Sequence, residues 1–199
     1  MSTKKPRREY PEFHPEDRAA LRAWLQENHQ SSTGVWVIYY KKESGKQRLI
    51  YSDAVDEALC FGWIDSVINP LDNERYKQLF TPRKPNSEWS AVNKKKLERL
   101  SAEGQMQAAG LAVIQVAKQN GSWSKIDEVE ALTVPEELAT RLEASPNAKK
   151  NFEAFSRSVK KMYLHWLNSA KRSETRAARL TEVMLCVEEN LKARQLRKK

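Results

Sequence analysis

The sequence predicts an α+β fold, with a small antiparallel sheet and helices in the N-terminal half and a helical C-terminal half. A run of β-branched and aromatic residues over 35–40 is typical of a strand. Two extended segments flank a turn over residues 69–73, which indicates a β-hairpin. After Pro85, apolar residues recur at three-and-four spacing between capping signals, as they do in helices.

The first elements are a helix and a strand. Pro15 suits a first helical turn, and the apolar stripe that follows predicts a helix to about Asn28. The strand over 35–40 comes next, and the polar residues 43–46 turn it.

A second helix and the hairpin follow. Ser52 is a good N-cap, and Gly62 suits the end of the helix that it starts. The hairpin is predicted to pair an extended segment over 64–68 with another over 75–81.

The remainder of the chain is predicted to be helical. One helix begins near Ser87 or Ser90 and ends by Gly104, and another spans 105–120. A short helix is expected to begin at Pro135, and further helices at Ser145-Pro146, at Ser158 and near Ser173.

Charge divides the chain into regions. Residues 1–147 hold 21 Lys/Arg and 21 Asp/Glu, whereas residues 148–199 hold 14 and 5. We predict a flexible basic arm over 1–12, an α+β region over 13–130, and a basic helical region over 131–199 that packs on it. A folded, positively charged surface attracts anionic ligands and polyanions.

The composition favours a cytoplasmic protein. No apolar run approaches the ~20 residues that span a membrane. The basic N-terminus leads into Glu9, Tyr10 and Pro11 and not into an apolar segment, unlike a secretion signal. The two cysteines, Cys60 and Cys186, suit reduced thiols, and Cys60 is expected to be a buried small hydrophobe and not a nucleophile.

Three motifs, in order, resemble the signatures of the bacterial YdeI/OmpD-associated family, whose members are often described as bacteriocin-protection proteins. We take the resemblance to cover residues 13–192. It implies an uncharacterised protein with a role in protection against antimicrobial peptides or related stress, and it implies no reaction or cofactor. The first motif is Asp56-Glu57-Ala58-Leu59-Cys60-Phe61-Gly62-Trp63-Ile64-Asp65. The second is Phe80-Thr81-Pro82-Arg83-Lys84-Pro85, followed by Ser87, Trp89-Ser90 and Asn93-Lys94. The third is Tyr163-Leu164-His165-Trp166, followed by Ala170-Lys171-Arg172 and Glu174-Thr175-Arg176.

The second motif is a candidate anion site. Prolines on both sides stiffen Arg83 and Lys84, and a helix N-terminus follows them. Trp89 and Asn93 would complete such a site. The alternative is that the prolines end a strand while Trp89 fills the core.

Trp63 and Asp65 lie where a helix leads into a strand, a position that often faces a pocket. An acid beside aromatic rings can acquire a raised pKa suited to proton transfer. The alternative is that Asp65 caps a turn or pairs with an arginine.

The basic helices form the third candidate. Arg172, Arg176 and Arg179 share one face of the last predicted helix by their spacing, and such a face binds phosphates. The alternative is a solvated charged face that is partly paired with Glu174 and Glu182. The ligand-binding candidates are Trp63, Asp65, Arg83, Lys84, Trp89, Asn93, Tyr163, Trp166, Lys171, Arg172 and Arg176.

Several chemistries have no support in the sequence. The three histidines are scattered, so no zinc site is predicted. No Gly-rich phosphate loop, dinucleotide motif or nucleophile elbow is present, and no cofactor is expected. No signal defines an oligomeric state.

We therefore predict a binding protein for an anionic ligand or polyanion. It would use Arg83, Lys84, Lys171, Arg172 and Arg176, with Trp63, Trp89, Tyr163 and Trp166 as aromatic walls or supports. One alternative is a small-molecule enzyme whose acid is Asp65 and whose Arg83 or Lys84 holds the substrate. The other is a nucleic-acid binding protein, which no motif supports.

Overall fold

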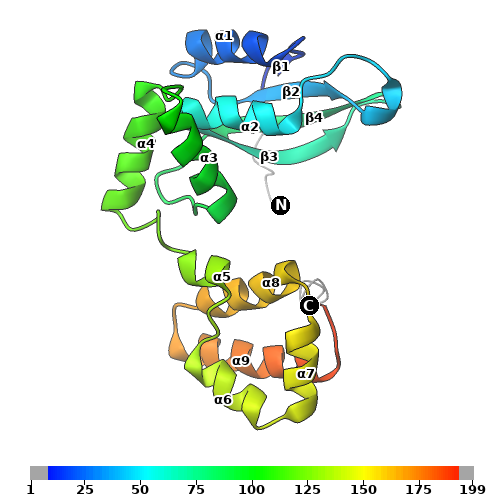
Figure 1. The fold of residues 1–199 in the computed structure, drawn as a ribbon, viewed down its shortest axis with the longest axis vertical. Coiled ribbons are helices and arrows are strands. Elements are labelled where there is room, and N and C mark those ends of the chain that lie inside the picture. Colours follow the sequence, from blue (N-terminus) through cyan, green and yellow to red (C-terminus); the bar gives the residue numbers. More distant parts are fainter. Residues whose placement is uncertain (1–8, 193–199) are drawn as a thin grey trace, which may run out of the picture. The chain divides into compact units, whose positions relative to one another are not determined.

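The computed structural model describes residues 9–192, which form two compact units. Unit 1 ends at Ser124, and unit 2 begins at Lys125. The predicted α+β class is confirmed, because unit 1 combines a small sheet with helices and the described part of unit 2 is helical (Figure 1). The packing of region 131–199 on the first region stays a prediction.

The sheet of unit 1 has the strand order β1-β2-β4-β3. The predicted strand over 35–40 and the predicted hairpin are both confirmed. The sheet is mixed and not purely antiparallel, because β1 pairs in parallel with β2. The strands are β1 (Glu12–Phe13), β2 (Val35–Tyr40), β3 (Trp63–Pro70) and β4 (Arg75–Pro82).

Strand β1 corrects part of the predicted flexible arm. Glu12 pairs with Trp36, and the Trp36 backbone N–H donates to the Pro11 carbonyl at 2.8 Å. The prediction missed β1 because two residues are too few to show an alternating pattern. Residues 1–8 of the predicted arm lie outside the described residues.

The helices of unit 1 match the predicted ones, with shifted starts. Asp17 caps the first, since its carboxylate accepts from the Ala20 N–H at 2.9 Å, so Pro15 lies outside that helix. Ser52 is not a cap: α2 begins one residue earlier, and the Ser52 hydroxyl accepts from Lys96. The helical elements are α1 (Arg18–Asn28), the 3-10 turn η1 (Lys42–Ser44), α2 (Tyr51–Cys60), α3 (Ala91–Ala102) and α4 (Ala108–Gln119).

The core of unit 1 lies on one face of the sheet. The β2 residues Val35, Val37 and Tyr39 point to this face, where apolar side chains of α1 and α2 meet them. Cys60 is fully buried there, as predicted, and burial raises the pKa of its thiol. Helix α4 approaches α2 so closely that a Cβ on Gly110 would lie 2.3 Å from the Cys60 carbonyl oxygen. Only glycine fits that position.

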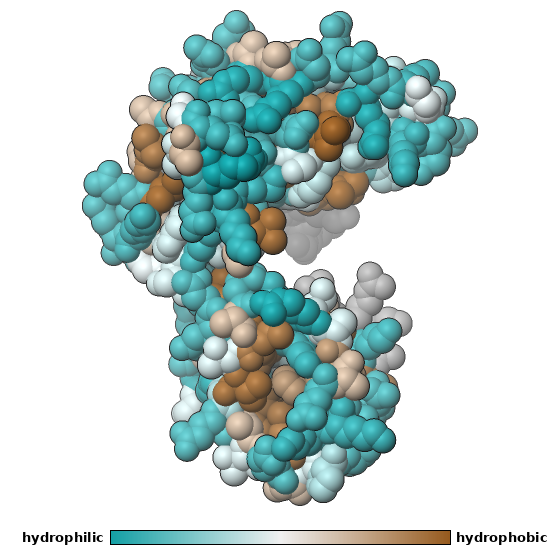
Figure 2. Space-filling view, viewed as in Figure 1, coloured by the Kyte–Doolittle hydropathy of each residue, from teal (hydrophilic) through white to brown (hydrophobic). Residues whose placement is uncertain are grey.

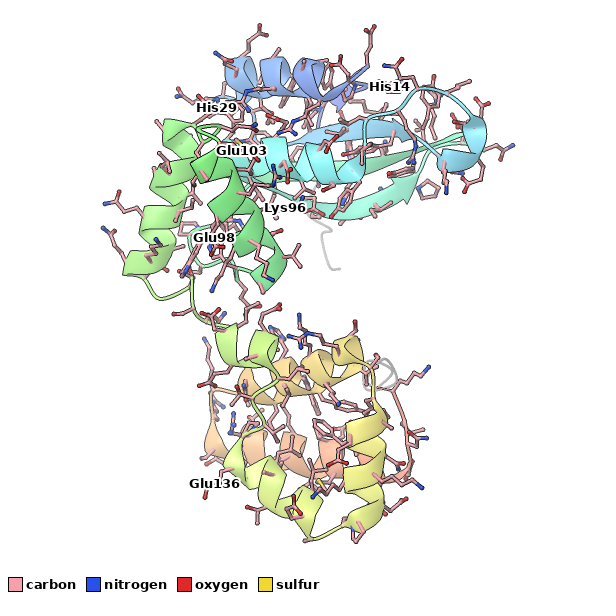
Figure 3. The ribbon with its side chains drawn as sticks, viewed as in Figure 1. His14, His29, Lys96, Glu98, Glu103 and Glu136 are labelled. Atoms are coloured by element: carbon pink, nitrogen blue, oxygen red, sulfur yellow. The ribbon has the colours of Figure 1, made fainter. Side chains whose placement is uncertain are left out.

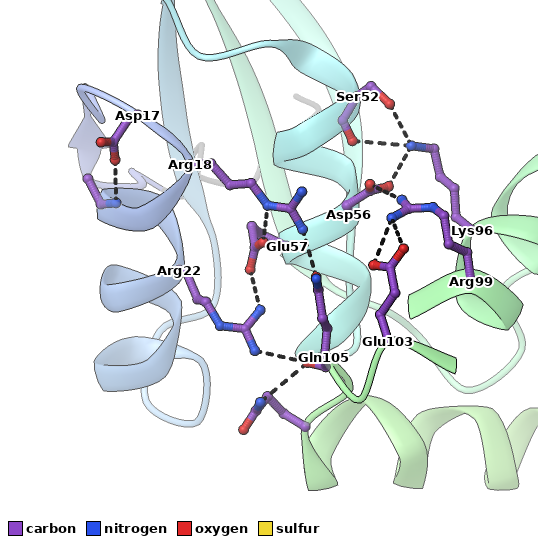
Figure 4. Close-up of polar contacts among 12 residues, drawn as sticks. Asp17, Arg18, Arg22, Ser52, Asp56, Glu57, Lys96, Arg99, Glu103 and Gln105 are labelled. Atoms are coloured by element: carbon purple, nitrogen blue, oxygen red, sulfur yellow. Dashed lines mark hydrogen bonds and ion pairs between the residues drawn. The ribbon is translucent and has the colours of Figure 1, made fainter. Parts of the chain in front are cut away.

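Two adjacent carboxylates of α2 tie it to both neighbouring helices (Figure 4). Glu57, 1% exposed, receives Arg18 at 2.5 Å and Arg22 at 2.7 Å, both from α1. Asp56, 4% exposed, receives Lys96 at 2.5 Å and also Arg99, both from α3. Buried charges are stable only when they are paired, so this network fixes α1 and α3 on α2.

Unit 2 consists of short helices, and the cap formed by Ser145 with Pro146 is confirmed. Helix α5 was not predicted, because five residues carry too little periodicity. Ser156, and not Ser158, caps α8: its hydroxyl accepts from the Val159 N–H. The helices are α5 (Asp127–Ala131), α6 (Glu136–Glu143), α7 (Pro146–Ala154), α8 (Arg157–Asn168) and α9 (Ser173–Glu188).

The core of unit 2 is apolar. Leu164, Leu167 and Val183 are fully buried between α8 and α9, together with leucines of α6 and Phe152 of α7. Figure 2 shows that apolar residues also reach the visible surface of this unit. No helix among residues 9–192 is long and apolar enough to cross a bilayer.

Candidate functional site

The second motif and the end of α4 together form a cluster of tryptophans and cations. We call it the tryptophan–cation cluster and define it as Arg83, Lys84, Trp89, Lys94, Lys118 and Trp123. Its members come from the segment after β4, from α3, and from the end of α4 and the loop after it.

Arg83 is the buried cation of the cluster. Its backbone N–H donates to the Gly62 carbonyl at 2.9 Å, which holds the chain as it leaves β4. Its guanidinium lies 3.7 Å from the centre of the Trp89 ring and donates to the Glu88 carbonyl at 2.8 Å. Burial lowers the pKa of Arg83 to about 10, and the Asp65 charge opposes that fall. Arg83 therefore supports the cluster from inside.

Trp123 is the accessible ring of the cluster. Its centre lies 5.2 Å from that of the buried Trp89. The ammonium groups of Lys94 and Lys118 lie 5.1 Å and 5.3 Å from the centre of the Trp123 ring. Two cations on different helices thus converge on one half-buried indole. Such a combination of ring and charge suits anions and stacked bases.

The loop after α4 is held in place by hydrogen bonds to the second motif. The Asn120 amide and the Ser122 hydroxyl donate to the Pro85 carbonyl at 3.0 Å and 2.9 Å. The Asn93 backbone N–H donates to the hydroxyl of Ser90, which is the N-cap of α3. Lys84 is exposed, and its side chain makes no hydrogen bond or ion pair with residues 9–192.

The side chains of Trp63 and Asp65 make their hydrogen bonds outside the tryptophan–cation cluster. Trp63 is 1% exposed, and its indole N–H donates to the His29 carbonyl. The Asp65 carboxylate accepts from the Tyr51 hydroxyl and from the Gln78 amide, each at 2.8 Å. Arg83 makes no hydrogen bond to Asp65, although the Asp65 charge acts on its pKa, so the acid and the clamp of the enzyme alternative are not in direct contact.

The unit 2 candidates fall into buried and exposed groups. Tyr163 is fully buried, and its hydroxyl donates to the Leu191 carbonyl at 2.5 Å. Trp166 is half-buried beneath the Arg179 guanidinium. Arg176 pairs with Glu137 and donates to the Leu167 carbonyl at 3.3 Å. Arg176 therefore caps the end of α8.

Arg179 also caps the end of α8, since its guanidinium donates to the Trp166 carbonyl and to the Ser169 hydroxyl. Two arginines of the predicted face, Arg176 and Arg179, are therefore engaged in hydrogen bonds within unit 2. Lys171 and Arg172, in the turn before α9, are exposed, and their side chains make no hydrogen bond or ion pair with the described residues.

The net charge is a property of the chain ends. Residues 1–8 and 193–199 each hold four Lys/Arg and no Asp or Glu, whereas residues 9–192 hold 27 Lys/Arg and 26 Asp/Glu. In unit 2, the acidic residues of α5 and α6 balance the cations of α8 and α9. Residues 148–192 still hold 10 Lys/Arg against 5 Asp/Glu, so a positively charged face on the last helices stays a prediction.

Two family models match the chain. A domain of unknown function (DUF8412) matches residues 13–113, and a family described as "Bacteriocin-protection, YdeI or OmpD-Associated" matches residues 131–190. The chain belongs to the first of these families, whose model covers half of it, and its C-terminal part matches the YdeI/OmpD-associated family. The YdeI/OmpD-associated match covers the third motif alone, so the expected span of 13–192 is wrong: the first two motifs lie in the other domain. No curated protein and no solved structure matched the chain significantly.

Sequence reasoning missed Lys118 and Trp123 of the cluster. The available signal was a tryptophan in a short polar loop between Gly121 and Lys125, a place where apolar cores do not require one. The histidines do not indicate a shared site, because His14 and His29 lie at opposite ends of α1 (Figure 3). Among residues 9–192, no three His, Cys, Asp or Glu side chains gather as a metal site requires.

Proposed function

We propose that this YdeI/OmpD-associated protein binds a phosphate-bearing anionic ligand at the tryptophan–cation cluster. The convergence of Lys94 and Lys118 on the half-buried Trp123 supports the proposal most strongly. Lys84 extends the positive charge toward solvent, while Arg83 and Trp89 hold the platform from below.

The chemistry of the cluster suits phosphate in two ways. Lysine ammonium groups pair with phosphate oxygens as mobile point charges. An indole beside them accepts a nucleobase or another flat group by stacking. Small polyphosphates would use the charges alone, whereas single-stranded nucleic acid would use the ring as well.

The test is a fluorescence titration of the full chain with tripolyphosphate and with single-stranded RNA, across a salt series. We expect Lys94→Gln with Lys118→Gln to weaken binding about tenfold and to reduce the salt slope by about two, because each phosphate contact contributes about one unit. The matched control is Lys42→Gln with Lys95→Gln, which removes the same charge from exposed positions, one of them next to Lys94.

Two outcomes would contradict the proposal: no binding of either ligand at low salt, or equal losses in the two double variants. Trp123→Leu separates the ligands, because only a stacked base loses affinity with the ring. Equal circular dichroism spectra would establish that the variants are folded.

A second candidate is polyanion binding through the basic chain ends, which the concentration of charge in residues 1–8 and 193–199 favours. Replacing the Lys/Arg of both ends by Gln would then remove salt-dependent binding that the Lys94/Lys118 variant keeps. Lys171→Gln with Arg172→Gln tests the exposed pair of unit 2. Arg176 is left intact, because it caps α8.

A protective role, which the family description names, is part of this proposal. It would follow if the protein occupied anionic sites that cationic peptides also seek. The same variants, expressed in cells challenged with a cationic bacteriocin, should then lose protection in parallel with binding.

A further inference from the structure

The helix-facing side of the sheet carries a second polar cluster, formed by Tyr39, Tyr51, Asp65, Tyr76 and Gln78. The strand register brings its members together: Tyr39 lies opposite Tyr76, and Gln78 lies one pair along on the same face. Asp65 lies opposite Phe80, so it points to that face too. Tyr51, in the first turn of α2, reaches down to the Asp65 carboxylate.

Two buried polar atoms in this cluster have no partner. The Tyr39 hydroxyl and the Gln78 carbonyl oxygen make no hydrogen bond, although their side chains are 1% and 2% exposed. Buried polar groups are nearly always satisfied, and an unsatisfied one costs free energy. The only other such atom among the described residues is the Nε of Arg83, a residue whose pKa responds to the Asp65 charge.

The unused capacity of the cluster is mostly that of a hydrogen-bond acceptor. The Gln78 amide already donates to Asp65, which leaves its carbonyl oxygen to accept. Both recorded bonds to Asp65 end on the same oxygen, Oδ2, so Oδ1 is left to accept as well. Burial raises the pKa of Tyr39, so its hydroxyl stays neutral.

Three of the five members of the cluster are aromatic rings. Tyr39 and Tyr76 stack with ring centres 5.0 Å apart, and Tyr51 stands beside them at 45% exposure. One carboxylate among tyrosine rings is the arrangement that attracts organic cations. Two cations of the chain lie near this cluster. Arg83, which stacks on Trp89, is affected by the Asp65 charge, and the charge of Arg48 acts on the pKa of Tyr76. Neither makes a hydrogen bond to Asp65.

We propose that this cluster binds the ammonium or guanidinium group of a small organic cation. The cation would donate to Asp65 and to the Gln78 carbonyl oxygen, with the tyrosine rings around it. The Tyr51 hydroxyl occupies Oδ2 of Asp65, so a cation that donates to both carboxylate oxygens must displace it. Tyr51 is thus a competitor for the site, and its exposed ring leaves it room to swing away.

The test titrates the full chain with methylguanidinium and with butylammonium, and follows tyrosine ring resonances by NMR. N-methylurea, which has nearly the shape of methylguanidinium without its charge, is the matched control. We expect saturable shifts for the cations only. Asp65→Asn should weaken binding at least about tenfold, since it removes the only carboxylate of the cluster.

Tyr51→Phe provides the decisive second variant. It keeps the ring and removes the competing hydroxyl, so we expect binding to tighten by about threefold, a modest hydrogen-bond effect. A purely structural role for Tyr51 would leave the affinity unchanged or lower it. The proposal is overturned if N-methylurea binds as well as the cations, if neither cation binds by about 10 mM, or if Asp65→Asn, folded by circular dichroism, binds them like the natural chain.

Discussion

Polar side chains are distributed unequally between the cores of the two units. All five buried polar or charged residues of the described chain belong to unit 1, namely Asp56, Glu57, Gln78, Arg83 and Ser122. The buried set of unit 2 is hydrophobic, and its one buried hydroxyl, that of Tyr163, is satisfied. Unit 2 uses its arginines at helix ends instead.

This difference separates two uses of charge. In unit 1, buried ion pairs fix helices in one arrangement, and further polar atoms are left over beside aromatic rings. In unit 2, apolar packing supplies the stability, and the cations satisfy carbonyls, form ion pairs outside the apolar core, or face solvent. Buried polar groups without partners are common at sites of function, so unit 1 is the part in which we look for binding.

The largest expected effect tests the buried ion pairs. Arg18→Gln with Arg22→Gln leaves Glu57 buried without a counter-charge, and we expect unit 1 to lose about 4 kcal/mol of unfolding free energy. Urea unfolding followed by tryptophan fluorescence reports on unit 1, which holds Trp24, Trp36, Trp63, Trp89 and Trp123.

The matched control for that variant lies in unit 2. Lys149→Gln breaks an exposed pair with Glu143, and the midpoint should not move measurably. An unchanged midpoint in the double arginine variant would mean that the buried network does not hold α1 in place.

A somewhat smaller effect tests the apolar core of unit 2. Leu164→Ala removes a fully buried side chain of α8, which should cost about 3 kcal/mol through lost contacts and the cavity left behind. Hydrogen exchange of the α8 and α9 amides measures the loss. Leu185→Ala, at a 59% exposed position of α9, should leave exchange unchanged; equal acceleration in both variants would argue against a specific core.

The smallest effect is a difference in acid sensitivity. Burial, aided by Arg75, lowers the pKa of His14, so the unfolded chain takes up a proton first as the pH falls through about 6.5. Unit 1 should therefore lose stability below that pH. Hydrogen bonds from Ser145 and Asn147 lower the pKa of Glu188 below 4.5, so its contribution to unit 2 is complete above pH 4.5 and is lost only on further acidification.

Unfolding midpoints measured between pH 8 and about pH 2 with single substitutions check this order. His14→Gln should flatten the fall below pH 6.5 without changing the acid limb at lower pH. Glu188→Gln should change the acid limb alone. The same pH profile in both variants would show that neither group controls acid sensitivity.

Much of the fold could be predicted from local signals. Strand β2, the β3–β4 hairpin and the capped helices α3 and α7 follow from residue types within a few positions. Elements β1 and α5 are too short for a periodic signal. The start of α2 was misplaced because Ser52, a good cap by type, is used by Lys96 from another helix.

The candidate site was less predictable, because it depends on contacts between distant segments. Arg83 and Trp89 are close in sequence, and their proximity could be predicted. Trp123 lies 34 positions after Trp89 in the sequence, and no local signal indicates that the two rings are in contact. For Arg176, helical spacing defines its face correctly but does not reveal that the end of α8 lies against that face.

The charge at the chain ends has a practical consequence for experiments. Residues 9–192 are almost isoelectric at neutral pH, so a trimmed protein would pass through a cation-exchange column that retains the full chain. A terminal affinity tag lies next to one of the two groups of four cations. An acidic tag would cancel part of their charge, and a polyhistidine tag would add to it below pH 6. Assays with polyanions therefore need protein from which every tag has been removed.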